Sequence, residues 1–450
     1  MTKPTAGDPG SDNRTAGASG RSPSLWRQRD FLKLWSAETV SQFGSQVSML
    51  VIPLVAILVL DAGAFQVGLL ATIEFLPFIL FTLPAGVWVD RLRRRPILIA
   101  GDLGRAVVLA TIPLAYAFDV LTIPQLYVVG FTAGTFTVFF DVAYQSYLPS
   151  LVERDQIVEG NSKLQVSVSA ATIAGPGIAG VIVSLVSAPF AILVDALSFV
   201  GSALFIFAIR RHEQEPNHAA AATGAPREGM RREIAVGLRF VVGHPYLRSI
   251  AACTGLANLF MNIAFAIYLL YAIRVLGLSA GVIGIVFGIG NVGALLGALG
   301  ASWAAIRFGV GRAIVWSAFL GGPALLLLAI APTDAPVPFL VASGILVGIS
   351  AMVYNINQVS LRQAITPEAM QGRMNATMRF IVWGTIPIGN LAGGTLGATI
   401  GLRETIWVGA IGSCLSFLPV ALSPLRRLQT IPAYGSAGPP EAPAGATGSG

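Results

Sequence analysis

Twelve segments of this 450-residue chain are each long and apolar enough to cross a lipid bilayer as a helix. A spanning helix needs about 20 consecutive, mainly apolar residues, and it makes its backbone hydrogen bonds within the segment. Charged residues make up only 11% of the chain, whereas soluble domains carry about 25%. The sequence therefore predicts an all-α membrane protein with twelve transmembrane helices, near residues 34–60, 66–88, 97–118, 124–146, 164–186, 189–209, 247–272, 279–304, 312–332, 336–357, 378–400 and 403–423.

An arginine-rich turn between the second and third segments orients the chain. Asp90 and four arginines fall within residues 90–95, and charges are too costly inside lipid for this turn to lie there. Short loops rich in arginine stay in the cytoplasm. With both termini on that side, the outer loops hold only Arg274 and Arg403 as basic residues. The sequence therefore predicts a multi-pass protein of the cell inner (plasma) membrane with both termini in the cytoplasm.

The longest loop between spans divides the chain into two sets of six spans. The end of this loop, 230–240, has the pattern of an amphipathic helix on the membrane face. Both tails are rich in Ala, Gly, Pro and Ser, a composition typical of disorder. The predicted organisation is two disordered cytoplasmic tails (1–24 and 426–450), two six-helix bundles (25–210 and 247–425) and a cytoplasmic linker (211–246) that carries the amphipathic helix.

A weak internal repeat relates the two halves. Asn161 precedes Gly175 by fourteen residues, and Asn375 precedes Gly389 by the same number. In each half another glycine follows five residues later. Parallel duplicated halves are a known transporter design, with the substrate site between them. The repeat therefore predicts two pseudo-symmetric bundles.

The arginine-rich turn also carries a family resemblance. Its pattern G-x-x-x-D-R-x-x-R-R resembles the signature loop of the major facilitator superfamily, with Arg93 where the family usually has a glycine. Matching positions are Gly86, Asp90, Arg91, Arg94 and Arg95. The resemblance implies the major facilitator fold and a cytoplasmic gate at this loop.

Further motifs resemble one branch of that superfamily. The segments around Asp102, Arg105 and Asp141 resemble bacterial drug-efflux proteins, a branch that includes macrolide, tetracycline and enterobactin exporters. The helix 5 motif, Gly175-Pro176 and Gly180, resembles that of antiporters. Its functional interpretation is an outer-side hinge, and close helix packing explains it equally well.

The gate hypothesis assigns partners to the charged residues. Asp102 and Arg105 are three residues apart and share a helix face. Asp141 lies near the inner end of helix 4, so we expect it to pair with Arg95 or Arg105 by charge-assisted hydrogen bonds. The alternative is that the arginines only set the membrane topology.

Three lone acids within the predicted spans are candidates for proton coupling. They are Glu38, Glu74 and Asp195. A carboxyl group in lipid is costly to ionise, which is the property that a proton carrier needs. The alternative is a paired or protonated acid with a structural role.

Polar residues at helical spacing predict which helices face a central cavity. Gln42 and Ser45 share the face of Glu38 in the first predicted span (34–60), and Asn258 and Asn262 form a similar pair in the seventh (247–272). The resemblance implies that both helices line the cavity. Hydrogen bonding between helices explains the asparagines equally well.

The sequence predicts no enzyme, metal site or cofactor. Cys253 and Cys414 lie in separate apolar segments, and none of the three lysines completes a phosphate-binding loop. Gly288–Gly293 reads G-x-G-x-x-G within a span, where it is explained by packing. Basic residues in short loops and tails, without aromatic residues between them, do not indicate nucleic-acid binding. Transport would then be driven by an ion gradient.

These features together predict a secondary transporter that exports a drug-like or siderophore-like amphipathic organic compound in exchange for protons. The expected partners are the lipid bilayer, this small substrate and protons, and the expected state is a monomer. The alternatives are a proton-coupled importer of the same fold, a lipid-moving protein, and a membrane scaffold or sensor that transports nothing.

Overall fold

The computed structural model describes residues 24–210 and 230–431, and the predicted tails and most of the linker lie outside these ranges. The described residues form helices and no β-strand. Eleven segments are long and apolar enough to cross a membrane. The twelfth, α14, is 32 residues long but less apolar, because it contains many Gly, Thr and Asn residues. The predicted fold of twelve transmembrane helices is confirmed.

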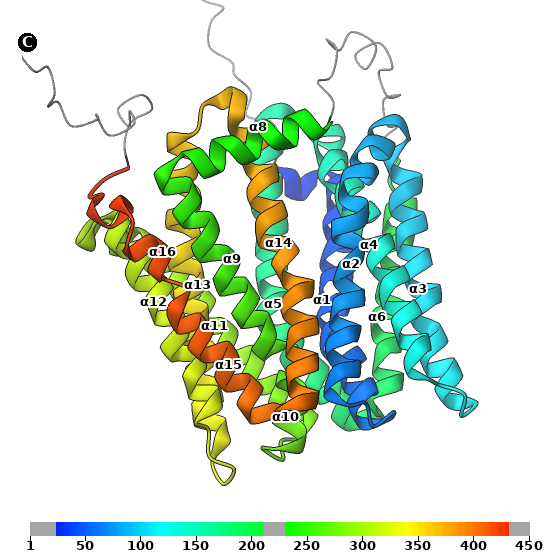
Figure 1. Ribbon diagram of the computed structural model, residues 1–450. Coiled ribbons are helices and arrows are strands. Elements are labelled where there is room, and N and C mark those ends of the chain that lie inside the picture. Colours follow the sequence, from blue (N-terminus) through cyan, green and yellow to red (C-terminus); the bar gives the residue numbers. More distant parts are fainter. Residues whose placement is uncertain (1–23, 211–229, 432–450) are drawn as a thin grey trace, which may run out of the picture.

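The first half holds six long helices (Figure 1). Helix α1 packs against α5 and α6, α3 packs against α4 and α6, and α2 packs against α4. A short 3-10 turn, η1 (Leu25–Arg27), precedes α1. The helices are α1 (Arg29–Leu58), α2 (Ala64–Arg91), α3 (Arg94–Ala117), α4 (Ile123–Leu151), α5 (Ile157–Val186) and α6 (Ala188–Phe207), with η2 (Arg154–Gln156) between α4 and α5.

The second half repeats this arrangement, with its first and sixth spans each broken into two helices. The segment with the amphipathic pattern forms α8, which packs against α9 and α14. The helices are α8 (Met230–Gly243), α9 (Pro245–Phe265), α10 (Tyr268–Arg274), α11 (Ala280–Phe308), α12 (Val310–Ala329), α13 (Pro336–Ile365), α14 (Glu368–Thr399), α15 (Leu402–Leu415) and α16 (Leu418–Ala421), with η3 (Pro424–Arg427) at the end.

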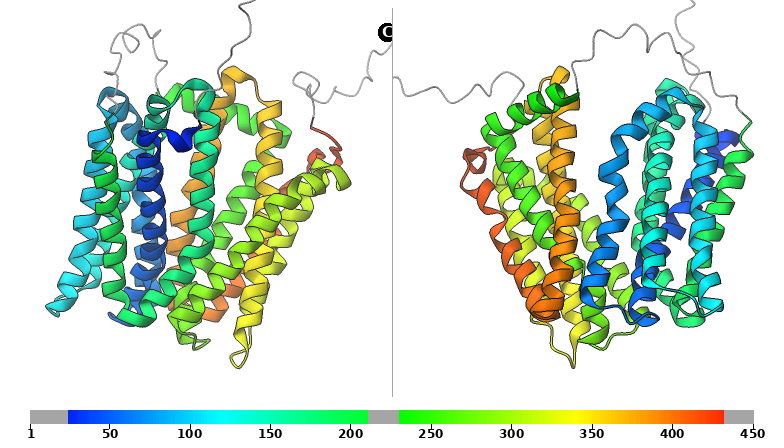
Figure 2. Two further views of the ribbon diagram at one scale, coloured as in Figure 1. Left: turned by 180° about the vertical axis from the view of Figure 1, so that it is seen from behind. Right: turned by 45° about the vertical axis from the view of Figure 1, so that its right-hand side comes forward.

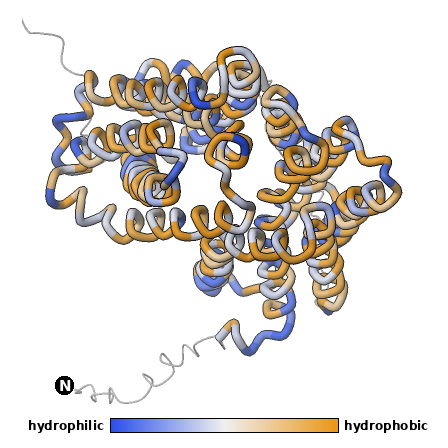
Figure 3. The backbone as a smooth tube through the Cα atoms, turned by 90° about the horizontal axis from the view of Figure 1, so that it is seen from below, coloured by the Kyte–Doolittle hydropathy of each residue, from blue (hydrophilic) through white to orange (hydrophobic). Residues whose placement is uncertain are grey.

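The packing pairs show the internal duplication directly. In the second half α9 packs against α14 and α15, α12 packs against α13 and α15, and α11 packs against α13. Each pair matches one of the first half when α9 to α15 are aligned with α1 to α6. Most residues along the helices are hydrophobic, and hydrophilic residues are more frequent in the loops, as the colouring of the backbone tube in Figure 3 shows. This distribution suits a bundle whose outer surface faces lipid.

The two halves meet through two symmetry-related helix pairs, α2 with α14 and α5 with α11. Glycines allow both contacts. A Cβ atom on Gly68 would lie 2.5 Å from the Cα atom of Gly394, and one on Gly180 would lie 2.8 Å from the carbonyl oxygen of Ala280. Small residues let membrane helices approach backbone to backbone, where van der Waals contact holds them.

Both contacts lie toward one end of the bundle. We call this the α10 end, because α10 lies there, and the opposite end the α8 end. Gly68 and Gly394 are near the α10 ends of their helices, as are Gly180 and Gly284. Toward the α8 end the ribbons of the two halves diverge, as the right-hand view of Figure 2 shows. The halves therefore meet at the α10 end and part toward the α8 end.

A side chain at one glycine contact should disturb this state. In Gly394→Val, the Cβ atom would meet backbone atoms of Gly68 and Ala64 at 2.9 and 3.0 Å. Overpacking costs about 1–3 kcal/mol, so the ratio of molecules closed to molecules open at the α10 end should fall about fivefold or more. Double electron–electron resonance between spin labels at Val120 and Asp334, two exposed loop positions at this end, measures the change once Cys253 and Cys414 are replaced.

Gly384→Val is the matched control for this experiment. It lies on the same helix, and a Cβ atom there would meet nothing within 4 Å. Its distance distribution should equal that of the unmodified protein. Equal distributions for both variants would contradict the assignment of Gly394 as a closing contact.

Candidate functional site: the seam between the halves and a buried charge cluster

Polar contacts accompany the glycines where the halves meet. We call this line of contact, α2 with α14 and α5 with α11, the seam. Asn291 of α11 donates its side-chain N–H to the carbonyl oxygen of Thr172 in α5 at 2.6 Å. On the other side, the Thr72 hydroxyl of α2 lies 3.3 Å from the carbonyl oxygen of Pro387 in α14. The Thr172 carbonyl is free to accept the bond from Asn291, because Pro176, four residues later in α5, has no backbone N–H. The two bonds fix the lateral register of the two helix pairs.

One ion pair joins the halves at the α10 end. Arg274 of α10 donates to the Asp61 carboxylate in the loop after α1, and to the carbonyl oxygen of Ala62 at 3.1 Å. The Asp61 side chain is 95% exposed. An exposed pair of this kind contributes little stability. The seal at this end therefore depends mainly on the glycine contacts.

Aromatic residues continue the α2–α14 contact toward the α8 end. The rings of Phe75 and Phe78 stack with centroids 5.3 Å apart, and each meets Trp383 of α14 edge-on, at 6.0 and 6.3 Å. The Arg379 guanidinium lies over the Trp383 ring, 4.9 Å from its centroid. The sequence did not predict this group, because Arg379 was counted among the cytoplasmic basic residues at the start of the predicted span 378–400.

The predicted helix 5 motif lies within packed contacts. A Cβ atom on Gly175 would lie 2.4 Å from the Cβ atom of Gln46 in α1. The carbonyl oxygen of Pro176 faces Gly284 of α11, and Gly180 makes the backbone contact described above. Close packing between α1, α5 and α11 therefore accounts for all three residues, and a hinge role stays a prediction.

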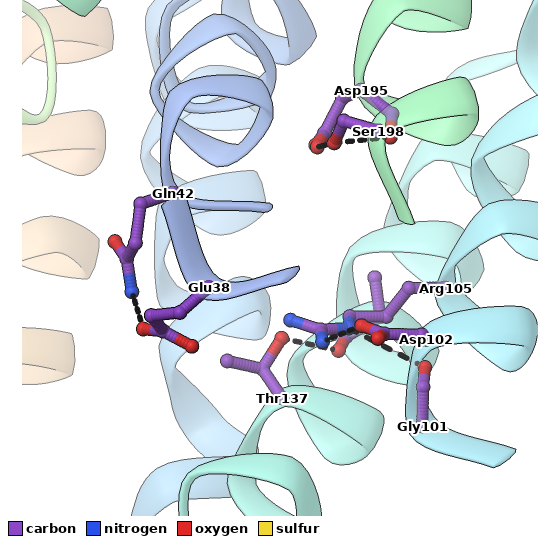
Figure 4. A network of polar contacts seen from close by, with 9 residues as sticks. Glu38, Gln42, Gly101, Asp102, Arg105, Thr137, Asp195 and Ser198 are labelled. Atoms are coloured by element: carbon purple, nitrogen blue, oxygen red, sulfur yellow. Dashed lines mark hydrogen bonds and ion pairs between the residues drawn. The ribbon is translucent and has the colours of Figure 1, made fainter. Parts of the chain in front are cut away.

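A buried ion pair is the centre of the charge cluster in the first half. Arg105 donates to Asp102 at 2.5 Å, and the two side chains are 4% and 0% exposed. The guanidinium lies over the rings of Phe140 and Phe199, with distances of 4.4 and 3.9 Å to their centroids. Figure 4 shows the pair on α3, facing α1 and α4. Aromatic faces stabilise a desolvated cation, so this arginine is held in place from several sides.

Glu38 lies on α1, across from the Asp102–Arg105 pair on α3 (Figure 4). Its Oε1 atom accepts a hydrogen bond of 2.7 Å from Gln42, and its Oε2 atom is buried without a partner. In Figure 4 Gln42 extends away from Arg105, toward the helices of the other half. Glu38 is thus placed between the buried pair and the seam. A buried carboxyl oxygen without a partner is costly when ionised.

The predicted pairing of Asp141 is wrong. Asp141 of α4 forms no ion pair with another described residue, although the charge of Arg105 acts on it. Arg105 is held by Asp102 instead, and Arg95 donates to the carbonyl oxygens of Ile206 and Phe207, at 3.3 and 2.5 Å. These carbonyls end α6, where a cation is favoured by the helix dipole.

The other two candidate acids lie apart from Glu38. Asp195 of α6 is 1% exposed and accepts a hydrogen bond of 3.1 Å from Ser198. It lies behind α1, close to Gly44. Glu74 of α2 is half-buried against Gly130 of α4, and no hydrogen bond joins its carboxyl group to another described residue. Of the three candidate acids, Glu38 lies beside the Asp102–Arg105 pair, Asp195 lies farther from it within reach of its charges, and Glu74 lies outside the cluster.

The predicted cavity residues Gln42, Ser45, Asn258 and Asn262 are all partly buried. Asn258 donates to the Thr254 carbonyl at 2.9 Å and Asn262 to the Asn258 carbonyl at 2.8 Å, so both amides bond within α9. Neither bond joins two helices. Their contribution to a cavity stays a prediction.

The signature loop lies at the α8 end, where the halves diverge. Asp90 and Arg91 are in the last turn of α2, and their side chains lie outside the described residues. A Cβ atom on Gly86 would meet nothing within 4 Å. Arg94 begins α3 and is half-buried. The gate role of this loop stays a prediction.

Comparison with known proteins decides the family. The model of the family described as "Transmembrane secretion effector" matches residues 19–442. The chain belongs to this family. It is a major facilitator superfamily transporter of the bacterial efflux branch, not an enzyme, and a multi-pass inner-membrane protein in contact with the lipid bilayer.

Named relatives and a solved structure agree with this membership. The multidrug efflux pump Tap of Mycobacterium tuberculosis is 27% identical over 415 residues, which cover 88% of this chain and 94% of Tap. The enterobactin exporter EntS of Salmonella typhimurium is 24% identical over 85% of this chain and 90% of EntS. A crystal structure of a bacterial homologue of the iron transporter ferroportin, in the inward-facing state, has a TM-score of 0.70 at 18% identity and covers 88% of this chain and 98% of that one.

Breaking the buried pair of this transporter should destabilise it strongly. Arg105→Gln leaves the Asp102 carboxylate buried without its cation, which costs about 3–5 kcal/mol. Unfolding of the purified protein, followed by circular dichroism during denaturant titration, measures this loss. The double variant Asp102→Asn with Arg105→Gln should recover part of it.

Arg274→Gln is the control, because it removes the arginine of an exposed pair. Its loss should stay below about 1 kcal/mol. Equal losses for the two single variants would show that burial does not set the value of the Asp102–Arg105 pair.

Proposed function

We propose that this transporter exports a drug-like or siderophore-like organic compound from the cytoplasm in exchange for protons, as a monomer, by alternating access. The observation that carries the proposal is the divergence of the halves at one end beside an acid-rich buried cluster. The named relatives, a multidrug efflux pump and an enterobactin exporter, support export over import.

The α8 end is the cytoplasmic end in this proposal. The signature arginines, the start of α8 and both described chain ends lie there, and the positive-inside rule places basic loops in the cytoplasm. The halves then meet on the outer side and diverge toward the cytoplasm. Rocking of one half against the other would open the α10 end and bring Gly86 toward the second half.

Proton binding follows from the balance of buried charges. The charge of Arg105 acts on Glu38, Asp102 and Asp141 as well as on Asp195. One cation cannot neutralise four carboxylates in a medium of low dielectric constant, so some of these carboxyl groups hold protons. Glu38 is the proposed carrier, because it lies between this cluster and the seam. Glu74, which has no partner, is the second candidate.

Export itself is tested in cells. Expression of the protein in a bacterium without its own efflux pumps should lower accumulation of part of a panel of amphipathic antibiotics and dyes, and a protonophore should restore it. Increased accumulation would favour the importer. Unchanged accumulation of every compound would favour a scaffold or sensor.

Glu38→Gln should uncouple transport from the proton gradient. The amide cannot release or bind a proton at that position, so drug-dependent proton movement in proteoliposomes should fall about tenfold or more. Binding of the same drug should remain, because Glu38 is buried. Glu159→Gln, which changes an exposed acid of α5, should leave coupling intact. If Glu38→Gln keeps full coupling, Glu38 is not the carrier, and the same measurement on Glu74→Gln tests the second candidate.

A further inference from the structure

The aromatic residues on the seam include a neighbouring cation, Arg379, that has no acidic partner among the described residues. Arg379 lies on α14, one helical turn from Trp383 toward the α8 end, and its guanidinium lies over the Trp383 ring. Its side chain is exposed. The rings of Phe75 and Phe78 face the same tryptophan from α2. The four side chains therefore form one group, which we call the seam aromatic group, to which both halves contribute.

Helical spacing places this group on the faces that join the halves. Trp383 precedes Pro387 by four residues and Gly394 by eleven, which keeps all three on one face of α14. Phe75 follows Gly68 by about two turns on the corresponding face of α2. Because Pro387 and Gly394 contact α2 directly, Trp383 and Arg379 continue that contact line to the point where the halves diverge.

The chemistry of Arg379 is that of an open anion site. When a guanidinium lies over an indole ring, the flat face of the guanidinium contacts the ring. The N–H groups along the edge of the guanidinium stay free to form two parallel hydrogen bonds with a carboxylate or sulfonate. Arg379 forms no ion pair or hydrogen bond with another described residue. The only acid in α14 is Glu368, its first residue, and Glu74, the acid nearest in sequence to Phe75, is turned toward α4.

We propose that the seam aromatic group binds an aromatic organic anion, with its acidic group on Arg379 and its ring among Trp383, Phe75 and Phe78. This inference rests on the proposed export function and names the chemical class of its substrate. Aromatic rings prefer edge or offset contact with other rings, which the present ring geometry already provides. A ligand held by both halves is bound differently once they rock, which is what a transported substrate requires.

Two dyes with the same ring system and opposite charge test this proposal. Fluorescein is an anion at pH 7.4 and rhodamine 6G is a cation, and both are xanthenes. Their affinities for the full-length protein in nanodiscs of zwitterionic lipid are measured by fluorescence anisotropy. The unmodified protein should bind fluorescein more tightly than rhodamine 6G.

Variants assign that preference to the seam aromatic group. Arg379→Gln should weaken fluorescein binding about tenfold or more and leave rhodamine 6G binding unchanged or stronger. Arg379→Lys should recover only part of the loss, because a lysine lacks the planar fork. Trp383→Leu should weaken the binding of both dyes. Arg307→Gln, an exposed arginine at the end of α11, is the control and should change neither affinity.

Three results would overturn the inference. They are a preference for rhodamine 6G or an absence of fluorescein binding, equal effects of Arg379→Gln and Arg307→Gln, and full displacement of fluorescein by phosphatidylglycerol with no effect of Trp383→Leu. The last result would assign Arg379 to a lipid headgroup. The proposed export function is tested separately by accumulation in cells, so it can stand while this inference fails.

Discussion

Backbone contact between glycines is the interaction on which this structure depends. Gly68 with Gly394 and Gly180 with Gly284 bring α2 to α14 and α5 to α11 at one end only. Lipid tails are as apolar as the helix side chains, so helices gain no hydrophobic free energy when they associate in a membrane. Their association depends on close packing and a few polar bonds. Because these contacts are local and contain no interlocking side chains, the halves can be closed at one end and diverge at the other.

The polar chemistry is distributed unequally between two halves that pack alike. The first half buries Glu38, Asp102, Arg105 and Asp195 on α1, α3 and α6, while the corresponding helices of the second half bury no described acid or arginine. A buried pair is costly to form and seldom adds stability. In the proposed mechanism, the two alike halves would share the rocking motion, whereas the buried charges that would handle protons lie in the first half alone.

Much of the architecture could be predicted from the sequence, because apolar length and the position of arginines are local properties. The twelve spans and the family followed from them. The i,i+3 spacing of Asp102 and Arg105 placed these two residues on one helix face, as the structure has them, but contacts between helices could not be predicted in the same way. Asp141 and Arg105 lie on different helices, and which acid Arg105 meets depends on the rotation of α3, which a hydropathy pattern does not set. Phe140 and Phe199, whose rings contact Arg105, and Trp383, whose ring contacts Arg379, are ordinary apolar residues in the sequence. Their contacts with the arginines depend on how α3 packs against α4 and α6 and on the side-chain conformations in α14.

The weakness of the seal at the α10 end is itself consistent with a transporter. A two-state machine needs two conformations of similar free energy, because a ligand can shift the balance only by its differential affinity for them. Under the proposed function, proton or substrate binding would have to overcome only the exposed Asp61–Arg274 pair and a few backbone contacts. A large apolar interface at the α10 end would hold the halves together there and leave only that conformation populated. The Asp102–Arg105 pair lies within one half, so the proposed rocking would leave it buried while it changed the surroundings of the seam aromatic group, to which both halves contribute.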